Sequence, residues 1–222
     1  MIQELGRPAP DSEILRGLAR EYIKRPPTPT LVNDLWGTIL ETAIQTRRLD
    51  IPVPNIECDR TQKELGALKK KKGIWVPETE LTYYQLGIIF PETQSYALQE
   101  NILIEDKFKQ DAKGIDVEGR IDAPNRNTTE ENLEKRFKYR ERKGMRLVTY
   151  ILASQLIKIL TGHYLDEGST SSILLGTSIN NRVIKAHFRV DGDLGVSWSW
   201  RLDPKDHNSR WGGRSEGIIE KA

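Results

Sequence analysis

The sequence predicts an α/β protein of the α+β kind, with a mixed central β-sheet flanked by helices and a β-hairpin near the C-terminus. Apolar residues recur at helical spacing within residues 11–48 and again within residues 131–160. Strand-like runs dominate residues 172–202, and the turn dipeptide Asp191-Gly192 separates the last two runs. A chain of 222 residues with 37% hydrophobic and 30% charged side chains has the composition of one globular domain.

The composition changes along the chain and indicates three segments of that single domain. We expect residues 1–50 to be an N-terminal helical segment packed on the core and residues 51–202 to be the α/β core. Residues 203–222 are rich in glycine and basic side chains and have few apolar ones, so we expect a basic, flexible tail.

The first helices are predicted from apolar periodicity and capping residues. Residues 11–24 and 31–48 each place apolar side chains on one helical face, and prolines separate the two stretches. Thr61 and Glu64 match a capping box that starts a third, short helix. That helix ends in four lysines before Gly73, which suits a helix C-terminus with a glycine cap. The lysines could also grip a phosphate backbone, or simply be solvated.

The remaining elements alternate between apolar runs and polar connections. Residues 74–76 and 81–90 are apolar runs that begin the predicted sheet. A long, partly irregular connection follows Lys107, and a second capping box then opens a helix over residues 131–143. Residues 145–160 are apolar on most sides, which predicts a central helix packed on the sheet.

The chemistry of the chain concentrates in residues 86–113. One apolar run ends at Pro91-Glu92, and a second, residues 102–104, ends in Glu105-Asp106-Lys107. Side chains alternate along a strand, so Glu105 and Lys107 point to one side and Asp106 points to the other. A hairpin between the two runs could place Glu92 beside Glu105.

Two carboxylates at one strand edge repel each other unless a cation lies between them. Mg²⁺ prefers oxygen ligands and often takes one or two protein carboxylates, with waters and a substrate phosphate at the other positions. A nearby lysine can orient or deprotonate a bound water, or neutralise charge on the phosphate. These residue types suit metal-assisted hydrolysis of a phosphodiester; the alternative is a surface hairpin with solvated charges.

The order of these motifs, Pro91-Glu92 followed by Glu105-Asp106-Lys107 at the ends of consecutive apolar runs, resembles the PD-(D/E)XK nuclease superfamily. This superfamily includes many type II restriction endonucleases, and its first acid is usually Asp where this chain has Glu92. The resemblance implies a restriction-endonuclease-like fold in which Glu92, Glu105 and Asp106 hold Mg²⁺, or Mn²⁺ in its place. It makes Glu92, Glu105 and Lys107 catalytic, assisted by Glu41, because members often carry a glutamate on an early helix. Glu41 could equally be a solvated helix residue.

Basic residues in three segments are the candidates for contact with nucleic acid. They are Lys109, Lys113, Arg120, Arg126, Lys138, Arg142, Arg210 and Arg214. The first four match, by the same resemblance, a basic glycine-containing segment that follows the lysine strand in several restriction enzymes. The next two lie on the basic face of the helix over residues 131–143, which suits a phosphate backbone or bulk water. The last two lie in the tail. Trp198 and Trp200 share a strand face that could be core, a stacking surface or a subunit contact.

Charge and cysteine content limit the remaining possibilities. The formal net charge of +2 gives no strong global field, so a nucleic-acid surface has to be a local patch. Cys58 is the single cysteine, which excludes an intramolecular disulfide and a cysteine-based zinc site. No run approaches the roughly 18 apolar residues of a membrane span, and the chain starts without a signal-peptide pattern. We therefore expect a cytoplasmic protein.

Two functions follow from these observations. The first is a Mg²⁺-dependent DNA endonuclease of the restriction type that acts on double-stranded DNA as a homodimer, because duplex cleavage needs two sites. The second is a non-catalytic nucleic-acid-binding or assembly subunit of a larger defence ribonucleoprotein complex. In the second case the charges at residues 105–107 are ordinary surface residues, and the C-terminal hairpin and tail bind the partner.

Overall fold

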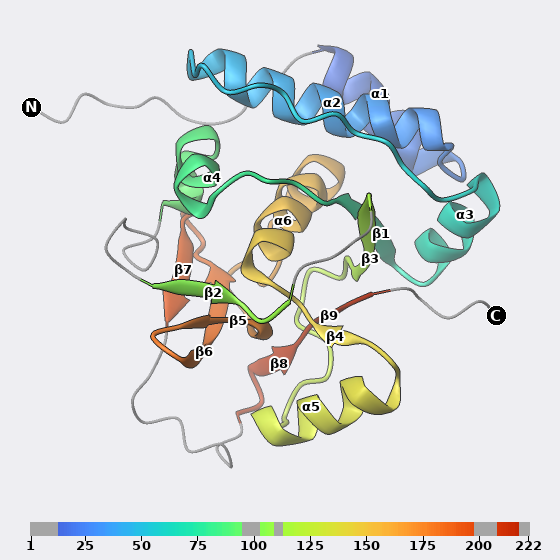
Figure 1. Cartoon of the computed structure of the whole chain (residues 1–222). Helices are drawn as coiled ribbons and strands as arrows, with labels where there is room; N and C mark the ends of the chain where they lie inside the picture. The colour runs from blue at the N-terminus through green and yellow to red at the C-terminus, as the bar shows by residue number, and fades with distance from the viewer. Residues whose placement is uncertain (1–12, 95–102, 109–112, 198–207, 218–222) are drawn as a thin grey trace, which may run out of the picture.

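The structure is a computed structural model, and it describes residues 13–94, 103–108, 113–197 and 208–217. Figure 1 shows α1 and α2 along one side of the molecule and α5 on the opposite side, with the strands between them. The helices are α1 (Glu13–Lys24), α2 (Pro29–Thr46), α3 (Gln62–Lys70), α4 (Tyr83–Ile89), the short 3-10 turn η1 (Pro91–Thr93), α5 (Glu130–Tyr139) and α6 (Leu147–Thr161). The strands are β1 (Gly73–Pro77), β2 (Ile104–Asp106), β3 (Gly114–Glu118), β4 (Lys143–Gly144), β5 (Ser171–Ile179), β6 (Arg182–Phe188), β7 (Leu194–Ser197), β8 (Trp211–Gly213) and β9 (Ser215–Glu216).

The α+β class is confirmed, and the strands form two sheets where one central sheet was expected. The first sheet has the order β1-β3-β9-β4 and is antiparallel. The second sheet has the antiparallel order β2-β5-β6-β7, and β8 pairs with β5 in parallel. The hairpin predicted at Asp191-Gly192 is confirmed as the connection between β6 and β7, where Gly192 has a φ of 92°.

Local capping chemistry sets the ends of the N-terminal helices. Thr28 Oγ1 accepts a hydrogen bond of 3.1 Å from the backbone N–H of Leu31 at the start of α2. The capping box predicted for α3 is confirmed. The predicted glycine cap is wrong: Lys72 takes the left-handed conformation after α3, with a φ of 57°, and Gly73 already belongs to β1. A Cβ on Gly73 would collide with Leu68, so close packing requires this glycine.

Residues 81–90 are not the strand that their apolar run predicts, because most of them form α4. Gln85 donates its backbone N–H to Thr82 Oγ1 at 3.2 Å, and the two residues form a capping box. A short apolar run does not distinguish a buried helix from a strand by its period alone, and here the polar capping pair favours the helix. Three buried residues then follow the helical spacing i, i+3 and i+4: Leu86, Ile89 and Phe90.

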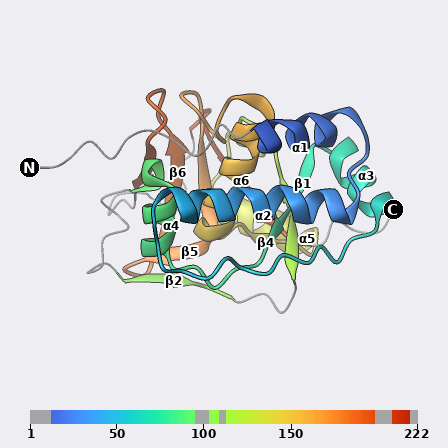
Figure 2. The ribbon, with the colours of Figure 1, turned by 90° about the horizontal axis from the view of Figure 1, so that it is seen from above.

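One large hydrophobic core joins the N-terminal helices to both sheets. The prediction of a central, mostly buried helix is confirmed in α6, whose residues from Tyr150 to Ile157 are all buried. Trp36 donates Nε1–H to the backbone oxygen of Trp75 at 3.1 Å and so ties α2 to β1. Figure 2 shows α2 running across the molecule. No helix in the described part of the chain is long and apolar enough to cross a membrane.

α5 covers part of the second sheet on the side away from the large core. The smaller core between them consists of Leu133, Phe137, Ile173 and Leu175. Thr129 caps α5 by accepting the backbone N–H of Asn132 at 3.2 Å, so the helix begins at Glu130, one residue before the predicted range of 131–143, and it ends earlier, at Tyr139. The connection predicted as irregular after Lys107 contains β3, which pairs with both β1 and β9.

Residues 208–217 do not form the flexible tail that their composition predicts, because they contribute β8 and β9. Gly212 and Gly213 are buried, and a Cβ at either position would collide with neighbouring residues. Arg214 is 0% exposed and donates to Asp166 Oδ1 at 3.1 Å. Glycine and arginine indicate flexibility in a composition count, but here they serve close packing and a buried ion pair with a residue distant in the sequence.

Candidate nucleic-acid interface

Glu92, the first expected metal ligand, lies in η1 at the end of α4. Tyr164 donates its hydroxyl to Glu92 Oε1 at 3.3 Å. The Tyr164 ring stacks on Phe188 at the end of β6, with 4.2 Å between the ring centroids. Glu92 therefore belongs to the end of the second sheet where β6 turns into β7.

Glu105, the second expected metal ligand, belongs to the other end of β6. Glu105 pairs with Ser178 in β5, and Ser178 pairs with Val183 near the start of β6. The strand from Val183 to Phe188 is about 16 Å long at about 3.3 Å per residue. Because 81–90 is mostly helical, the hairpin that would bring Glu92 beside Glu105 does not form. The structure does not bring these two carboxylates together.

Asp106 ends β2, the edge strand of the second sheet, and Lys107 follows it; both form hydrogen bonds with neighbouring elements. The hydroxyl of Tyr83 donates to Asp106 Oδ1 at 2.6 Å, and the hydroxyl of Thr177 donates to the same oxygen. Lys107 donates its backbone N–H to the oxygen of Gly176 at 2.9 Å, and its side chain is exposed. Strand alternation leaves Lys107 on the side opposite Asp106. Both side chains are exposed, and the Asp106 carboxylate is hydrogen-bonded to two hydroxyl groups of the fold.

The residues present do not fit the expected Mg²⁺ or Mn²⁺ site. Among the described residues, no three or more His, Cys, Asp or Glu side chains are grouped so that they could hold a metal ion. Glu41 is exposed on α2, where Gln45 donates Nε2–H to it at 2.9 Å. A cation shared by Glu92 and Glu105 would have to bridge a separation several times longer than a ligand bond of about 2 Å. Burial raises the pKa of the Cys58 thiol to about 11, so this side chain is no activated nucleophile either.

Three residues expected to contact nucleic acid already have partners within the fold. Arg214 is buried against Asp166, as described above. Arg142 donates Nε–H to Ser215 Oγ at 2.6 Å and also donates to backbone oxygens of β3 and β9. Lys113 is exposed and forms an ion pair with Glu57. Buried Arg214 is not available to a ligand, and binding by Arg142 would require it to give up these contacts.

The other candidates divide simply. The exposed ones are Arg120, Arg126, Lys138 and Arg210. Lys109, Trp198 and Trp200 lie outside the described residues.

A basic and aromatic surface forms around Trp211 in β8. Lys185 of β6 places its Nζ over the Trp211 ring, and this lysine is only 7% exposed. Arg210 precedes the tryptophan in the chain. Arg126 precedes Asn127, whose backbone N–H donates to the oxygen of Trp211 at 3.1 Å. Arg210 and Arg126 are both exposed. Each is next in sequence to a residue of the Trp211–Asn127 backbone hydrogen bond, which fixes β8.

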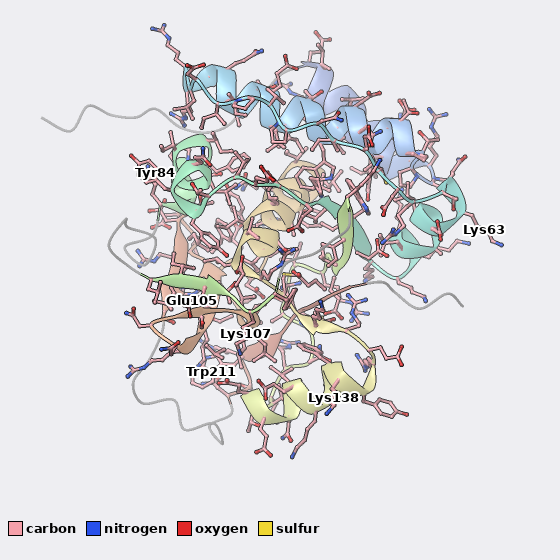
Figure 3. All side chains as sticks on the ribbon, in the orientation of Figure 1. Lys63, Tyr84, Glu105, Lys107, Lys138 and Trp211 are labelled. Carbon is pink, nitrogen blue, oxygen red and sulfur yellow. The ribbon has the colours of Figure 1, made fainter. Side chains whose placement is uncertain are left out.

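Lys107 and Glu130 lie next to the same surface. Glu130 is the first residue of α5, and the charges of Lys107 and Lys185 both act on its carboxyl group. Burial raises the pKa of Glu130 and the neighbouring Glu134 raises it further, whereas the two lysines oppose the shift. In Figure 3, Lys107 and Trp211 are labelled between β2 and α5. We define the Trp211 surface as Lys107, Arg126, Lys185, Arg210 and Trp211.

Sequence reasoning assigned two cations of this surface, Arg126 and Arg210, to nucleic-acid contact and assigned Lys107 to catalysis. It missed the pairing of Lys185 with Trp211. Lys185 alternates along β6 with Ile184 and Ala186, which belong to the large core, so it lies on the opposite face of the sheet, where it is also buried. That alternation gives the face on which the lysine lies but not its partner, which lies in the segment predicted as a tail. Only the parallel pairing of β8 with β5 brings Trp211 to Lys185.

No family model, no curated protein and no solved structure matches this chain.

Proposed function

We propose that this protein binds nucleic acid through the Trp211 surface, as a non-catalytic binding or assembly subunit of a larger ribonucleoprotein complex in the cytoplasm. The observation that carries the proposal is the Lys185 ammonium held over the Trp211 ring. Exposed Arg210 precedes Trp211, exposed Arg126 precedes the residue that bonds to it, and Lys107 acts on the same Glu130 carboxyl group as Lys185. A local cluster of this kind supplies the field that the small net charge of the whole chain does not.

The arrangement suits a polyanion for two physical reasons. An aromatic ring attracts an ammonium group by about 0.5–2 kcal/mol, so Trp211 helps to hold the Lys185 ammonium at this surface, where the Glu130 carboxyl group also interacts with it. A side chain that is already held loses less conformational entropy when a ligand binds. Each phosphate that such cations neutralise releases counterions, which makes the affinity depend on salt.

A direct test measures binding of a fluorescent DNA duplex of about 20 base pairs at several salt concentrations. Replacing Arg126 and Arg210 with glutamine should lower the affinity on the order of tenfold and reduce the slope of log K against log salt by about 1.8. The matched control replaces Arg20 and Lys24, two exposed cations of α1 on the opposite side of the molecule. Equal losses in both double variants, or no binding by the wild type, would contradict the proposal.

The endonuclease stays a prediction, and the same protein preparation tests it. Plasmid DNA is incubated with Mg²⁺ or Mn²⁺ and the protein. Because Glu92 and Glu105 lie too far apart to share an ion, any cleavage should be the same for the wild type, Glu105→Ala and Lys107→Ala. Cleavage that both substitutions abolish would restore the catalytic account. The homodimer rests on duplex cleavage alone, and light scattering of the purified chain tests it.

A further inference from the structure

The lysine run after α3 contains one structural lysine and three exposed ones. Lys69 donates Nζ–H to the backbone oxygens of Tyr22 at 2.5 Å, Ile23 at 2.6 Å and Arg25 at 3.0 Å. These carbonyls lie at the C-terminal end of α1, where unsatisfied oxygens favour a cation. Lys69 therefore caps α1. The exposed positive charge of the run comes from its last three lysines.

Those three lysines lie near Arg120 in the structure, at the edge of the first sheet. Lys70, Lys71 and Lys72 are exposed, and so is Arg120. Gly119 donates its backbone N–H to the oxygen of Lys72 at 2.9 Å, which places Arg120 one residue from the end of the run. We define Lys70, Lys71, Lys72 and Arg120 as the lysine surface.

A single segment, residues 119–127, connects the lysine surface to the Trp211 surface. Its first residue bonds to Lys72 and its last bonds to Trp211. The backbone between them is fixed: Arg214 donates to the oxygen of Ile121 at 2.8 Å, and Ala123 donates to Thr170 Oγ1 at 2.9 Å. Eight residue steps span at most about 29 Å, so the two surfaces are held within that distance.

We propose that the lysine surface is a second phosphate-contact site and that one nucleic-acid molecule occupies both surfaces. This inference rests on the proposed function and names how the nucleic acid is recognised, which is through its phosphodiester backbone and independently of base sequence. A duplex of about 20 base pairs is about 68 Å long, at 3.4 Å per pair. One such molecule is longer than the separation of the two surfaces.

The chemistry of the Trp211 ring favours backbone recognition over base stacking. One face of the ring already carries Lys185, and the indole also packs against the smaller core under α5. A base that stacked there would have to displace the lysine. The two surfaces together instead offer lysine and arginine side chains, which bind phosphate as point charges or bidentate forks.

The test removes three charges from the lysine surface, in the variant Lys70→Gln, Lys71→Gln, Arg120→Gln. Lys72 is kept because of its left-handed backbone. The matched control removes three exposed charges elsewhere, in the variant Arg16→Gln, Arg20→Gln, Lys63→Gln. Lys63 shares α3 with the run but lies at the helix start, on the outer edge in Figure 3. Binding of the duplex of about 20 base pairs is measured against salt for both variants and for the wild type.

The lysine-surface variant should lose about 2–3 in the slope of log K against log salt, at about 0.9 per phosphate contact, and the control should keep the wild-type slope. Duplexes of different base sequence should give the same loss. A wild-type slope in the lysine-surface variant overturns the second site and leaves the Trp211 surface standing. Absence of binding by the wild type overturns both. A polyglutamate of equal charge that binds as tightly as the duplex overturns the assignment of nucleic acid as the partner.

Discussion

Two buried cations beside the second sheet, Arg214 and Lys185, are held by different chemistry. Arg214 is 0% exposed and donates to Asp166, to Ser172 Oγ at 2.9 Å and to backbone oxygens. Lys185 is 7% exposed and lies over an indole ring. The arginine forms an ion pair with a buried carboxylate, whereas the lysine lies against an aromatic ring and its charge also interacts with the Glu130 carboxyl group.

The Arg214–Asp166 pair stabilises the fold, whereas the Lys185–Trp211 pair belongs to the surface that we propose binds a ligand. Asp166 also accepts hydrogen bonds from the hydroxyl groups of Tyr150 at 3.1 Å, Thr170 at 2.6 Å and Ser172 at 2.6 Å. A buried charge pair with this many hydrogen bonds stabilises a unique arrangement but presents no net charge to solvent. The Lys185 side chain instead lies over the Trp211 ring, and its charge acts together with that of Lys107 on the Glu130 carboxyl group.

The largest expected effect comes from breaking the buried pair. Arg214→Met leaves the Asp166 carboxylate buried without its cation, which should cost about 3–5 kcal/mol of the free energy of unfolding. Urea denaturation followed by circular dichroism measures this loss. Lys185→Met is the matched comparison and should cost clearly less, because its removal strands no fully buried carboxylate. Equal losses in the two variants would mean that both cations are structural.

A second, smaller effect should appear in binding and not in folding. Lys185→Met should lower the affinity for duplex DNA about threefold to tenfold and reduce the salt slope by about 0.9, the value for one phosphate contact. The control is Lys158→Met, because Lys158 lies over the Tyr164 ring at 4.7 Å, away from the Trp211 surface. Both variants lose a lysine that faces an aromatic ring. An equal change in affinity in both would remove Lys185 from the binding surface.

The elements that the sequence predicts well are those with a local cause. Thr61 fixes the start of α3 and Asp191-Gly192 fixes the β6–β7 turn, because each acts on neighbouring backbone groups. Residues 81–90 were harder, since an apolar run fits a helix or a strand, and the Thr82 capping box was the signal that would have decided between them. The length and apolar character of α6 predict its central place directly.

The site depends on contacts between distant parts of the chain, and a local pattern does not contain them. Arg210 and Arg214 are four residues apart and equally basic, yet one is exposed and the other is fully buried against Asp166. Glu92 and Glu105 follow successive apolar runs, but the first run is helical and carries its acid to the far end of β6. The tertiary fold determines which residue each charged side chain contacts, and therefore the role of that side chain.

The smallest expected effect sharpens the same comparison through pH. Burial and Glu134 raise the pKa of Glu130, and the charges of Lys107 and Lys185 act against that shift. A carboxyl group with a raised folded-state pKa adds stability in its protonated form, and this contribution is lost as pH rises through that pKa. Protonation also removes a negative charge beside the Trp211 surface. Binding of duplex DNA should therefore tighten as the pH falls through the range just above the ordinary glutamate value.

Glu130→Gln isolates this carboxyl group from the other groups that titrate nearby. The variant should bind duplex DNA about twofold to threefold more tightly at neutral pH, since it removes a charge that repels phosphate. Its affinity should also change less between acid and neutral pH than that of the wild type. Glu134→Gln is the control: it removes a like charge that raises the pKa of Glu130, so the pH dependence should persist and move to lower pH. A Glu130→Gln variant with the affinity and pH profile of the wild type would show that phosphate does not approach this end of α5.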